Sequence, residues 1–147
     1  MLEVEVFGSL DDLRSVAPDA PPSAEVERLC VLAAASAGVK DGHLAIEFVS
    51  AERIARLNVE HLGKAGPTDV LSFPIDGAGG RGDVSRELGD VVICPEHTTD
   101  LREAIVHGVL HLLGMDHETD AGEMLALQAE LLVDRRSRRP PIGRERR

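Results

Sequence analysis

Three histidines at fixed spacing constrain this chain more than any other feature. His107 and His111 are four residues apart, so on a helix they project from one face, about 6 Å apart along the axis. Gly114 follows three residues later, and glycine is the residue type that ends a helix in the left-handed conformation. The chain can then turn back, so that His117 joins the other two imidazoles around one ion and leaves a coordination position open. The spacing therefore predicts a metal site made by these three side chains.

The residues around these histidines predict a buried helix. The segment 104–113 is almost entirely apolar apart from His107 and His111, and a helix that is apolar all round is buried. Buried imidazoles need polar partners. The alternative interpretation is two core histidines bonded to backbone groups, with the third histidine in a loop. The combined spacing of three histidines and Gly114 favours metal binding.

Position 108 separates this pattern from the zinc peptidases. Those enzymes read H-E-x-x-H-x-x-G-x-x-H, and the glutamate is their general base. Gly108 stands in its place here, so the chain has the metal-binding pattern without the peptidase base, and a zinc peptidase is the least favoured function. Asp116 precedes the third histidine. It is a candidate for a direct catalytic part or for a turn residue that orients an imidazole.

Three segments together resemble the YbeY family, the bacterial endoribonucleases and rRNA maturation factors. They are the run 107–117, the run G-P-T-D-V-L-S-F-P at 66–74 with the L-N pair at 57–58, and the run L-G-D-V-V-I at 88–93. Their order and spacing also fit, over roughly residues 44–132. The resemblance implies an α+β domain, in which a small mixed β-sheet packs on a central zinc-binding helix with a metzincin-like site.

The resemblance also implies the function. A single-strand-specific, zinc-dependent endoribonuclease would act in 16S rRNA 3′-end maturation and ribosome quality control, with one zinc ion held by His107, His111 and His117. The implied partners are small-subunit rRNA, the small ribosomal subunit and its assembly proteins, with no DNA. The alternative is a metal-stabilised assembly factor that binds the small subunit without catalysis.

One position departs from the family pattern. The family usually carries an arginine four residues after the asparagine of the L-N pair, and that position is Leu62 here. Lys64 matches a basic position of the family and is the candidate for a phosphate contact, as a point charge rather than a bidentate fork. Asp69 and Asp90 are further candidates, either to orient metal ligands or simply to cap turns.

Charge and aromatic content limit how this chain can bind RNA. The net charge is −10, which opposes unaided binding to nucleic acid. Three Phe and no Trp or Tyr provide no aromatic platform on which bases could stack. Seven arginines stand against two carboxylates in residues 134–147. We therefore expect one domain over residues 1–134 and a disordered Arg-rich tail over residues 135–147, either solvated or touching rRNA.

The sequence predicts a cytoplasmic protein with reduced thiols. Cys30 and Cys94 lack disulfide or CxxC spacing, and a buried free thiol is the expected state of each; for Cys94 a place near the metal is the alternative. The first residues lack the basic and apolar regions of a signal peptide, and no run reaches transmembrane length.

Hydrophobic periodicity predicts the order of the elements. Strands are expected at 2–6, 44–49, 70–73 and 88–93, the third of them at a sheet edge because proline flanks it on both sides. Helices are expected at about 23–37, 51–60, 96–113 and 120–134, with Ser23 and Ser50 as caps. The Gly-rich segment 76–86 is expected to form a loop beside the site.

Overall fold

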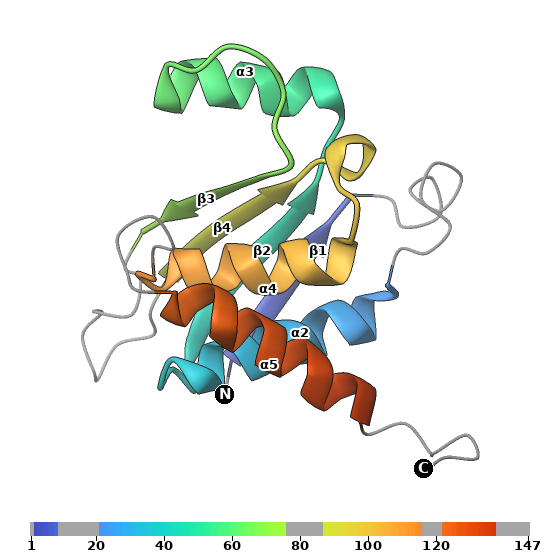
Figure 1. Cartoon of the computed structure of the whole chain (residues 1–147). Helices are drawn as coiled ribbons and strands as arrows, with labels where there is room; N and C mark the ends of the chain where they lie inside the picture. Colours follow the sequence, from blue (N-terminus) through green and yellow to red (C-terminus); the bar gives the residue numbers. More distant parts are fainter. Residues whose placement is uncertain (1, 9–20, 76–86, 116–121, 138–147) are drawn as a thin grey trace.

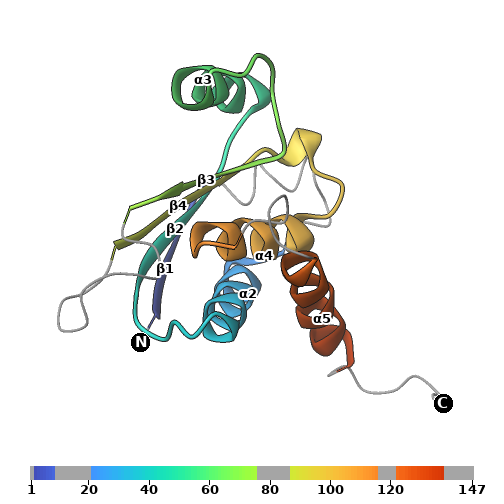
Figure 2. The same cartoon turned by 60° about the vertical axis from the view of Figure 1, so that its left-hand side comes forward.

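A four-stranded sheet runs through the part of the chain that the computed structural model describes, which is residues 2–8, 21–75, 87–115 and 122–137 (Figure 1). Helices pack on both faces of this sheet (Figure 2). The strands are β1 (Leu2–Phe7), β2 (Gly42–Phe48), β3 (Val70–Pro74) and β4 (Glu87–Ile93), and the helices are α2 (Ser23–Ser36), α3 (Ala51–Leu62), α4 (Leu101–Leu112) and α5 (Glu123–Ser137). This mixed architecture agrees with the predicted α+β class.

The sheet order is β1-β2-β4-β3, with β3 at one edge. β1, β2 and β4 are parallel, whereas β3 runs antiparallel to β4 with Ser72 opposite Val91. The sequence-based prediction of an edge strand at 70–73 is therefore confirmed. Pro74 ends this strand, where its missing N–H costs no bond to an outer neighbour.

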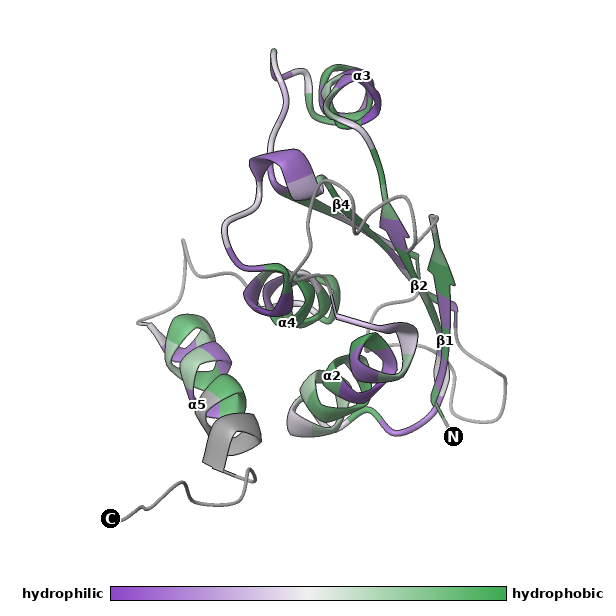
Figure 3. Ribbon diagram, turned by 90° about the vertical axis from the view of Figure 1, so that its right-hand side faces the viewer, coloured by the Kyte–Doolittle hydropathy of each residue, from purple (hydrophilic) through white to green (hydrophobic). Residues whose placement is uncertain are grey.

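Helix α4 is the centre of the larger core. It lies with α2 against one face of the sheet, and α5 packs on the side of α4 that faces away from the sheet (Figure 3). Its apolar side chains are fully or almost fully buried, as the all-round apolar sequence predicts. A smaller cluster on the opposite face joins Ile54 and Leu57 of α3 to apolar side chains of the sheet and of the residue after β4; these are Leu71, Val92 and Cys94. The histidine-bearing helix is thus held between a sheet and another helix.

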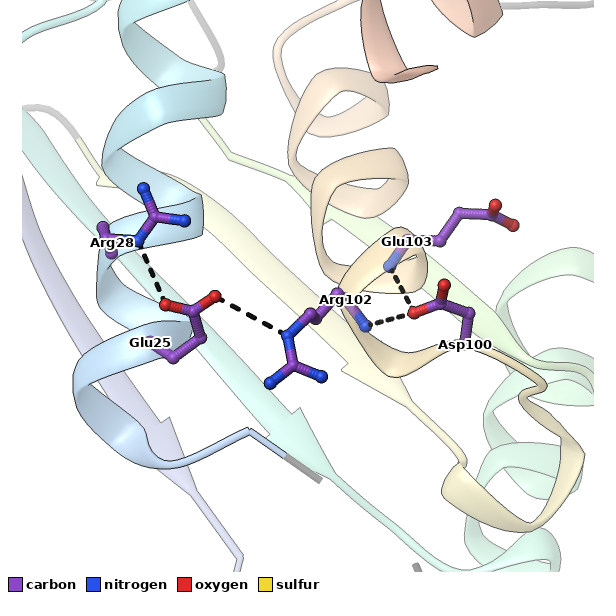
Figure 4. A network of polar contacts seen from close by, with 5 residues as sticks. All are labelled: Glu25, Arg28, Asp100, Arg102 and Glu103. Carbon is purple, nitrogen blue, oxygen red and sulfur yellow. Dashed lines mark hydrogen bonds and ion pairs between the residues drawn. The ribbon is translucent and has the colours of Figure 1, made fainter. Parts of the chain in front are cut away.

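The start of α4 differs from the prediction. The helix begins at Leu101 rather than near Glu96, because Asp100 caps it: the Asp100 carboxylate accepts the backbone N–H groups of Arg102 at 3.0 Å and Glu103 at 3.2 Å (Figure 4). Residues Pro95–His97 form a separate 3₁₀ turn. Glu25 of α2 accepts from Arg28 at 3.0 Å and lies 3.6 Å from the Nε atom of Arg102, which ties the start of α4 to α2.

The other helix ends agree with the sequence to within a few residues. Ser50 caps α3 by accepting the Arg53 N–H at 3.2 Å, as predicted. Ser23 is already the first residue of α2, and Pro22 occupies the capping position instead. Helix α5 continues to Ser137, so the first three residues of the expected tail are helical, while residues 138–147 and the loop 76–86 lie outside the described residues. In the described ranges, every helix is too short or too polar to cross a membrane.

Helix α4 approaches the sheet closely at Gly108. A Cβ atom at this position would lie 2.4 Å from Cγ1 of Val91 and 3.2 Å from Cγ2 of Val70. The Ser72 hydroxyl donates to the Gly108 carbonyl at 2.9 Å, which joins the edge strand to the helix at the same place. Only glycine lets the helix backbone come this close to β3 and β4.

We predict that Gly108→Ala lowers the free energy of unfolding by about 1–3 kcal/mol, even though alanine favours helix by about 1 kcal/mol. The reason is that Val91 is fully buried and its β-branched side chain cannot rotate away easily. Urea denaturation monitored by circular dichroism measures this. The matched test is the same substitution in a Val91→Ala background, where the cost should fall sharply. An equal cost in both backgrounds would contradict this account of the contact.

His43 joins three strands on the sheet face opposite α4. Its ring lies between Glu87 of β4 and Glu5 of β1 and bonds to both carboxylates. The bond to Glu87, and then the bond to Glu5, raise the pKa of His43 above its ordinary value of 6.5, although partial burial opposes them. The protonated imidazole can donate to both carboxylates at once. The charged form of His43 therefore stabilises the pairing of β1, β2 and β4.

We predict that this stabilisation is present at pH 5.5–6.5 and disappears as the pH rises through the raised pKa of His43, because proton binding is stronger in the folded state than in the unfolded state. The measurement is the difference in unfolding free energy between the wild type and His43→Gln across about pH 5.5 to 9. This difference should shrink towards alkaline pH. A difference that stays constant or grows would show that the charge of His43 does not matter.

Candidate functional site

His107 and His111 lie side by side on one face of α4. Their ring centroids are 6.0 Å apart and the ring planes are close to perpendicular, at 85°. His107 is half-buried towards α5, whereas His111 is exposed in the last turn of the helix. The four-residue spacing predicted that both imidazoles share a face, and they do.

Gln128 of α5 holds the ring of His107. The Nδ1–H group of His107 donates to Oε1 of Gln128 at 2.8 Å, and only 8% of the Gln128 surface is exposed. With a proton on Nδ1, the lone pair of the neutral ring is on Nε2. A bond of this kind is what orients metal-binding histidines in proteins, because it selects both the tautomer and the ring angle. Gln128 was not predicted from the sequence, where its only signal is a polar residue between the apolar positions of the last helix.

The chain reverses direction after α4 at Gly114, as the sequence predicts. Gly114 has a φ of +105°, and its N–H donates to the His111 carbonyl at 3.1 Å. The N–H of Met115 reaches back to the Leu110 carbonyl, also at 3.1 Å, so the last turn is closed by the reversed chain. Asp116 and His117 follow directly but lie outside the described residues. Within the described residues, no three His, Cys, Asp or Glu side chains are grouped to hold a metal ion.

Lys64 lies in the loop that follows α3 and leads to β3. Gly63 ends α3 in the left-handed conformation, and Lys64 is exposed two residues after the exposed Leu62. The buried Asn58 side chain donates to the Gly66 carbonyl at 3.0 Å, and the backbone carbonyl of Asn58 accepts from the Lys64 N–H at 3.3 Å. Asn58 thus anchors the loop that carries Lys64, although this lysine does not line the cavity beside His107.

The two aspartates considered in the sequence analysis are separated by the sheet. Asp69 lines the cavity beside His107, and its Oδ1 accepts from the Val70 N–H at 2.8 Å. Asp90 alternates with Val91, whose side chain meets Gly108 of α4, so Asp90 points from the opposite face of the sheet. The idea that Asp90 orients a metal ligand is therefore wrong, because the sheet lies between it and α4.

Cys94 is also removed from the histidine pair. It is fully buried in the cluster beneath α3, and this burial raises the pKa of its thiol. The expectation of a buried free thiol is confirmed for Cys94 and for Cys30, which lies in the core beside α2.

A cavity of about 250 Å³ opens beside His107. It lies where α4 and α5 meet the chain segments before β3 and after β4, so four separate parts of the sequence form its walls. The residues that line it are Asp69, Val70, His97, Thr98, Thr99, Asp100, Glu103, Ala104, His107, Leu125 and Gln128. Polar and acidic side chains line most of this cavity, together with a few apolar ones. Of the two histidines on α4, only His107 lines it.

Comparison with known proteins identifies the family. The family model described as "Endoribonuclease YbeY" matches residues 21–135, which include every helix and strand described above except β1 and the last two residues of α5. The chain belongs to the YbeY family. The resemblance inferred from three short segments of the sequence is thereby confirmed over most of the chain.

Several curated relatives carry the name "Endoribonuclease YbeY". A protein of Bacillus pumilus is 37% identical over 132 residues, which is 75% of this chain and 83% of the relative. A protein of Salinispora tropica is 42% identical over 65% of this chain and 76% of its own length. A protein of Thermobifida fusca is 44% identical over 61% of this chain and 70% of its own length.

A solved structure supports the fold as well. The solution structure of a protein from Thermotoga maritima aligns with a TM-score of 0.52 and 22% sequence identity, over 99% of this chain and all of that chain. At this level of identity the likeness supports the arrangement of helices and strands and nothing more specific.

We predict that the Nδ1–H tautomer of His107 dominates in the metal-free protein at a pH where the ring is neutral, because the Gln128 carbonyl oxygen accepts that proton. The measurement is a long-range ¹H–¹⁵N correlation spectrum of the imidazoles. In Gln128→Leu, which keeps the apolar contacts but removes the acceptor, the Nδ1–H population should fall. A wild-type ring protonated on Nε2 would contradict the geometry of this pair.

Proposed function

We propose that this chain is a single-strand-specific, metal-dependent endoribonuclease that acts on small-subunit rRNA in 3′-end maturation and ribosome quality control. Its membership of a family of endoribonucleases supports the activity. The dependence on a metal ion is supported by the pair of imidazoles on α4, of which His107 is oriented by Gln128.

The proposed cofactor is one zinc ion held by His107, His111 and His117. The donors fit this ion chemically, because neutral imidazoles are common zinc ligands and two rings 6.0 Å apart are within reach of one ion. Three protein ligands also leave one coordination position for substrate or water, as a catalytic site requires. Bound zinc would supply Lewis acidity towards a phosphoryl oxygen and would lower the pKa of water.

The protein groups around this site have separate proposed roles. Gln128 fixes the tautomer and the angle of the His107 ring. Asp116 is proposed to orient the neighbouring histidine or to take part in proton transfer. Lys64 is proposed to contact an RNA phosphate, and its loop is anchored by Asn58. Leu62 occupies the position where the family usually has an arginine. Lys64 would therefore contact the phosphate without the bidentate contact that the arginine could make.

The proposed place of action is the small ribosomal subunit in the cytoplasm, with assembly proteins as partners. A net charge of −10 supports a need for positioning by a partner, because phosphate repulsion opposes binding of the isolated protein to RNA. The Arg-rich end of the sequence could supply a local phosphate contact.

The proposal predicts that the purified protein cleaves an RNA fragment from the 3′ end of the small-subunit rRNA, and that a chelator stops this cleavage. His111→Ala, prepared identically, should lose the activity because it removes a proposed metal ligand. His43→Ala is the matched control, since this histidine lies on the sheet face opposite α4, and it should cleave like the wild type.

Equal cleavage by the wild type and His111→Ala would point to a contaminating nuclease and would contradict the proposal. Absence of cleavage by both, with retained binding to small-subunit particles in a pull-down, would favour the non-catalytic assembly factor. Cleavage of a peptide library that a chelator stops would instead support a zinc peptidase.

A further inference from the structure

The cavity beside His107 has a chemical character that a phosphate does not fit. Three carboxylate residues line it, Asp69, Asp100 and Glu103, and its described lining contains no lysine or arginine. These carboxylates do not form a cation site with the histidines either, because no metal-binding group of three is found among the described residues. A cavity that opens onto a proposed RNA-cleaving site and repels phosphate is suited to an uncharged part of the RNA that donates hydrogen bonds.

The volume and the walls are suited to a single base. About 250 Å³ is below the roughly 300–1,000 Å³ typical of pockets for drug-sized ligands, so the cavity takes one planar ring system rather than a dinucleotide. Val70, Ala104 and Leu125 provide apolar wall for the faces of a base. Protein sites that read an unstacked base combine such walls with hydrogen bonds to its Watson–Crick edge.

Glu103 is the carboxylate of the cavity that has both oxygen atoms available to a ligand. Asp100 uses its Oδ1 atom to cap α4, and Oδ1 of Asp69 accepts from the Val70 N–H and the Thr68 hydroxyl. In contrast, the Glu103 carboxylate has no hydrogen bond or ion pair within the described residues, and its side chain extends away from the ion pairs of Arg102 (Figure 4). Glu103 is also one helical turn before His107, on the same side of α4.

Gln128 provides an amide donor at the same cavity. Its Oε1 is engaged by His107, and its amide nitrogen Nε2 has no hydrogen-bond acceptor among the described residues. The side chain is more than nine-tenths buried and lines the cavity. An amide N–H₂ group that lines a cavity can donate to an acceptor on a ligand. The cavity thus offers one amide donor and one carboxylate with two acceptor oxygens.

Guanine is the base whose Watson–Crick edge complements one amide donor and one carboxylate. Its Watson–Crick edge presents the O6 acceptor followed by two neighbouring donors, N1–H and N2–H, and a carboxylate can accept both donors in a bidentate pair. Adenine and cytosine each present one amino donor beside a ring nitrogen that a carboxylate would repel. Uracil presents a single imide donor between two carbonyl acceptors.

We propose that this cavity is a guanine-binding subsite, in which Glu103 accepts from N1–H and N2–H and Gln128 Nε2 donates to O6. The inference rests on the proposed function, since it takes the base to belong to the RNA substrate. It makes Glu103 a specificity-determining residue: a guanine next to the scissile bond enters the cavity and places the adjoining phosphodiester beside His107.

The test uses single-stranded oligoribonucleotides that differ at one base next to a mapped scissile bond, on either side of it. That base is guanine, inosine, 7-deazaguanine or adenine. Inosine lacks only the N2 amino group, and 7-deazaguanine keeps the whole Watson–Crick edge. We expect guanine and 7-deazaguanine to give kcat/KM values about tenfold above those of inosine and adenine, because both keep the two neighbouring donors that the Glu103 carboxylate would accept.

Glu103→Gln should collapse the ratio between guanine and inosine, since an amide has one acceptor oxygen in place of two. Glu27→Gln, an exposed glutamate on α2 outside the cavity, is the matched control and should keep the wild-type ratio. Equal rates with guanine and inosine in the wild type, or an unchanged ratio in Glu103→Gln, would overturn the subsite.

A direct titration separates this inference from the proposed function. GMP and IMP are titrated into the wild type and Glu103→Gln, and binding is followed by the chemical shifts of the backbone amides. We expect GMP to bind about tenfold tighter than IMP to the wild type and equally to the variant. If no RNA is cleaved, the proposed function fails while this titration still decides the subsite; equal affinities in the wild type would overturn it.

Discussion

The close packing of α4 onto β3 and β4 at Gly108 is the contact on which the candidate site depends. No side chain separates the helix backbone from Val91 and Val70 at this point, and Ser72 bonds to the Gly108 carbonyl. Because His107 immediately precedes Gly108 and His111 follows by three residues, this contact determines how far both imidazoles stand from the edge strand. The sheet thereby acts as a rigid support for the histidine-bearing face of the helix.

The same contact bears on the difference between this chain and zinc peptidases. In those enzymes a glutamate occupies the position of Gly108, but here a Cβ atom would already lie 2.4 Å from Val91. A larger side chain would force the helix away from the sheet and move both histidines with it. The absence of the peptidase base is thus part of the packing of this domain, and the polar groups near the histidines come from elsewhere: Gln128 from α5, and Asp69 from the segment before β3.

Local patterns in the sequence predicted the helices and strands well, because hydrophobic periodicity, capping residues and prolines mark where these elements lie. The sequence alone predicted the edge position of β3, the Ser50 cap and the left-handed conformation of Gly114, and the structure has all three. The start of α4 was misplaced because the apolar and charged residues before Asp100 do not distinguish a capped helix from a longer one. Gln128 and the cavity could not be predicted, since both depend on how α5 lies against α4, and no pattern within one segment encodes that packing.

The account depends most on three imidazoles sharing one ion, of which His107 and His111 are brought together on α4 and His117 follows the turn at Gly114. X-ray absorption at the zinc edge of the loaded protein tests this most directly. The account predicts one ion with three imidazole nitrogens at about 2.0–2.1 Å and a further light-atom ligand. A sulfur ligand, or fewer than three imidazoles around a stoichiometric ion, would contradict it.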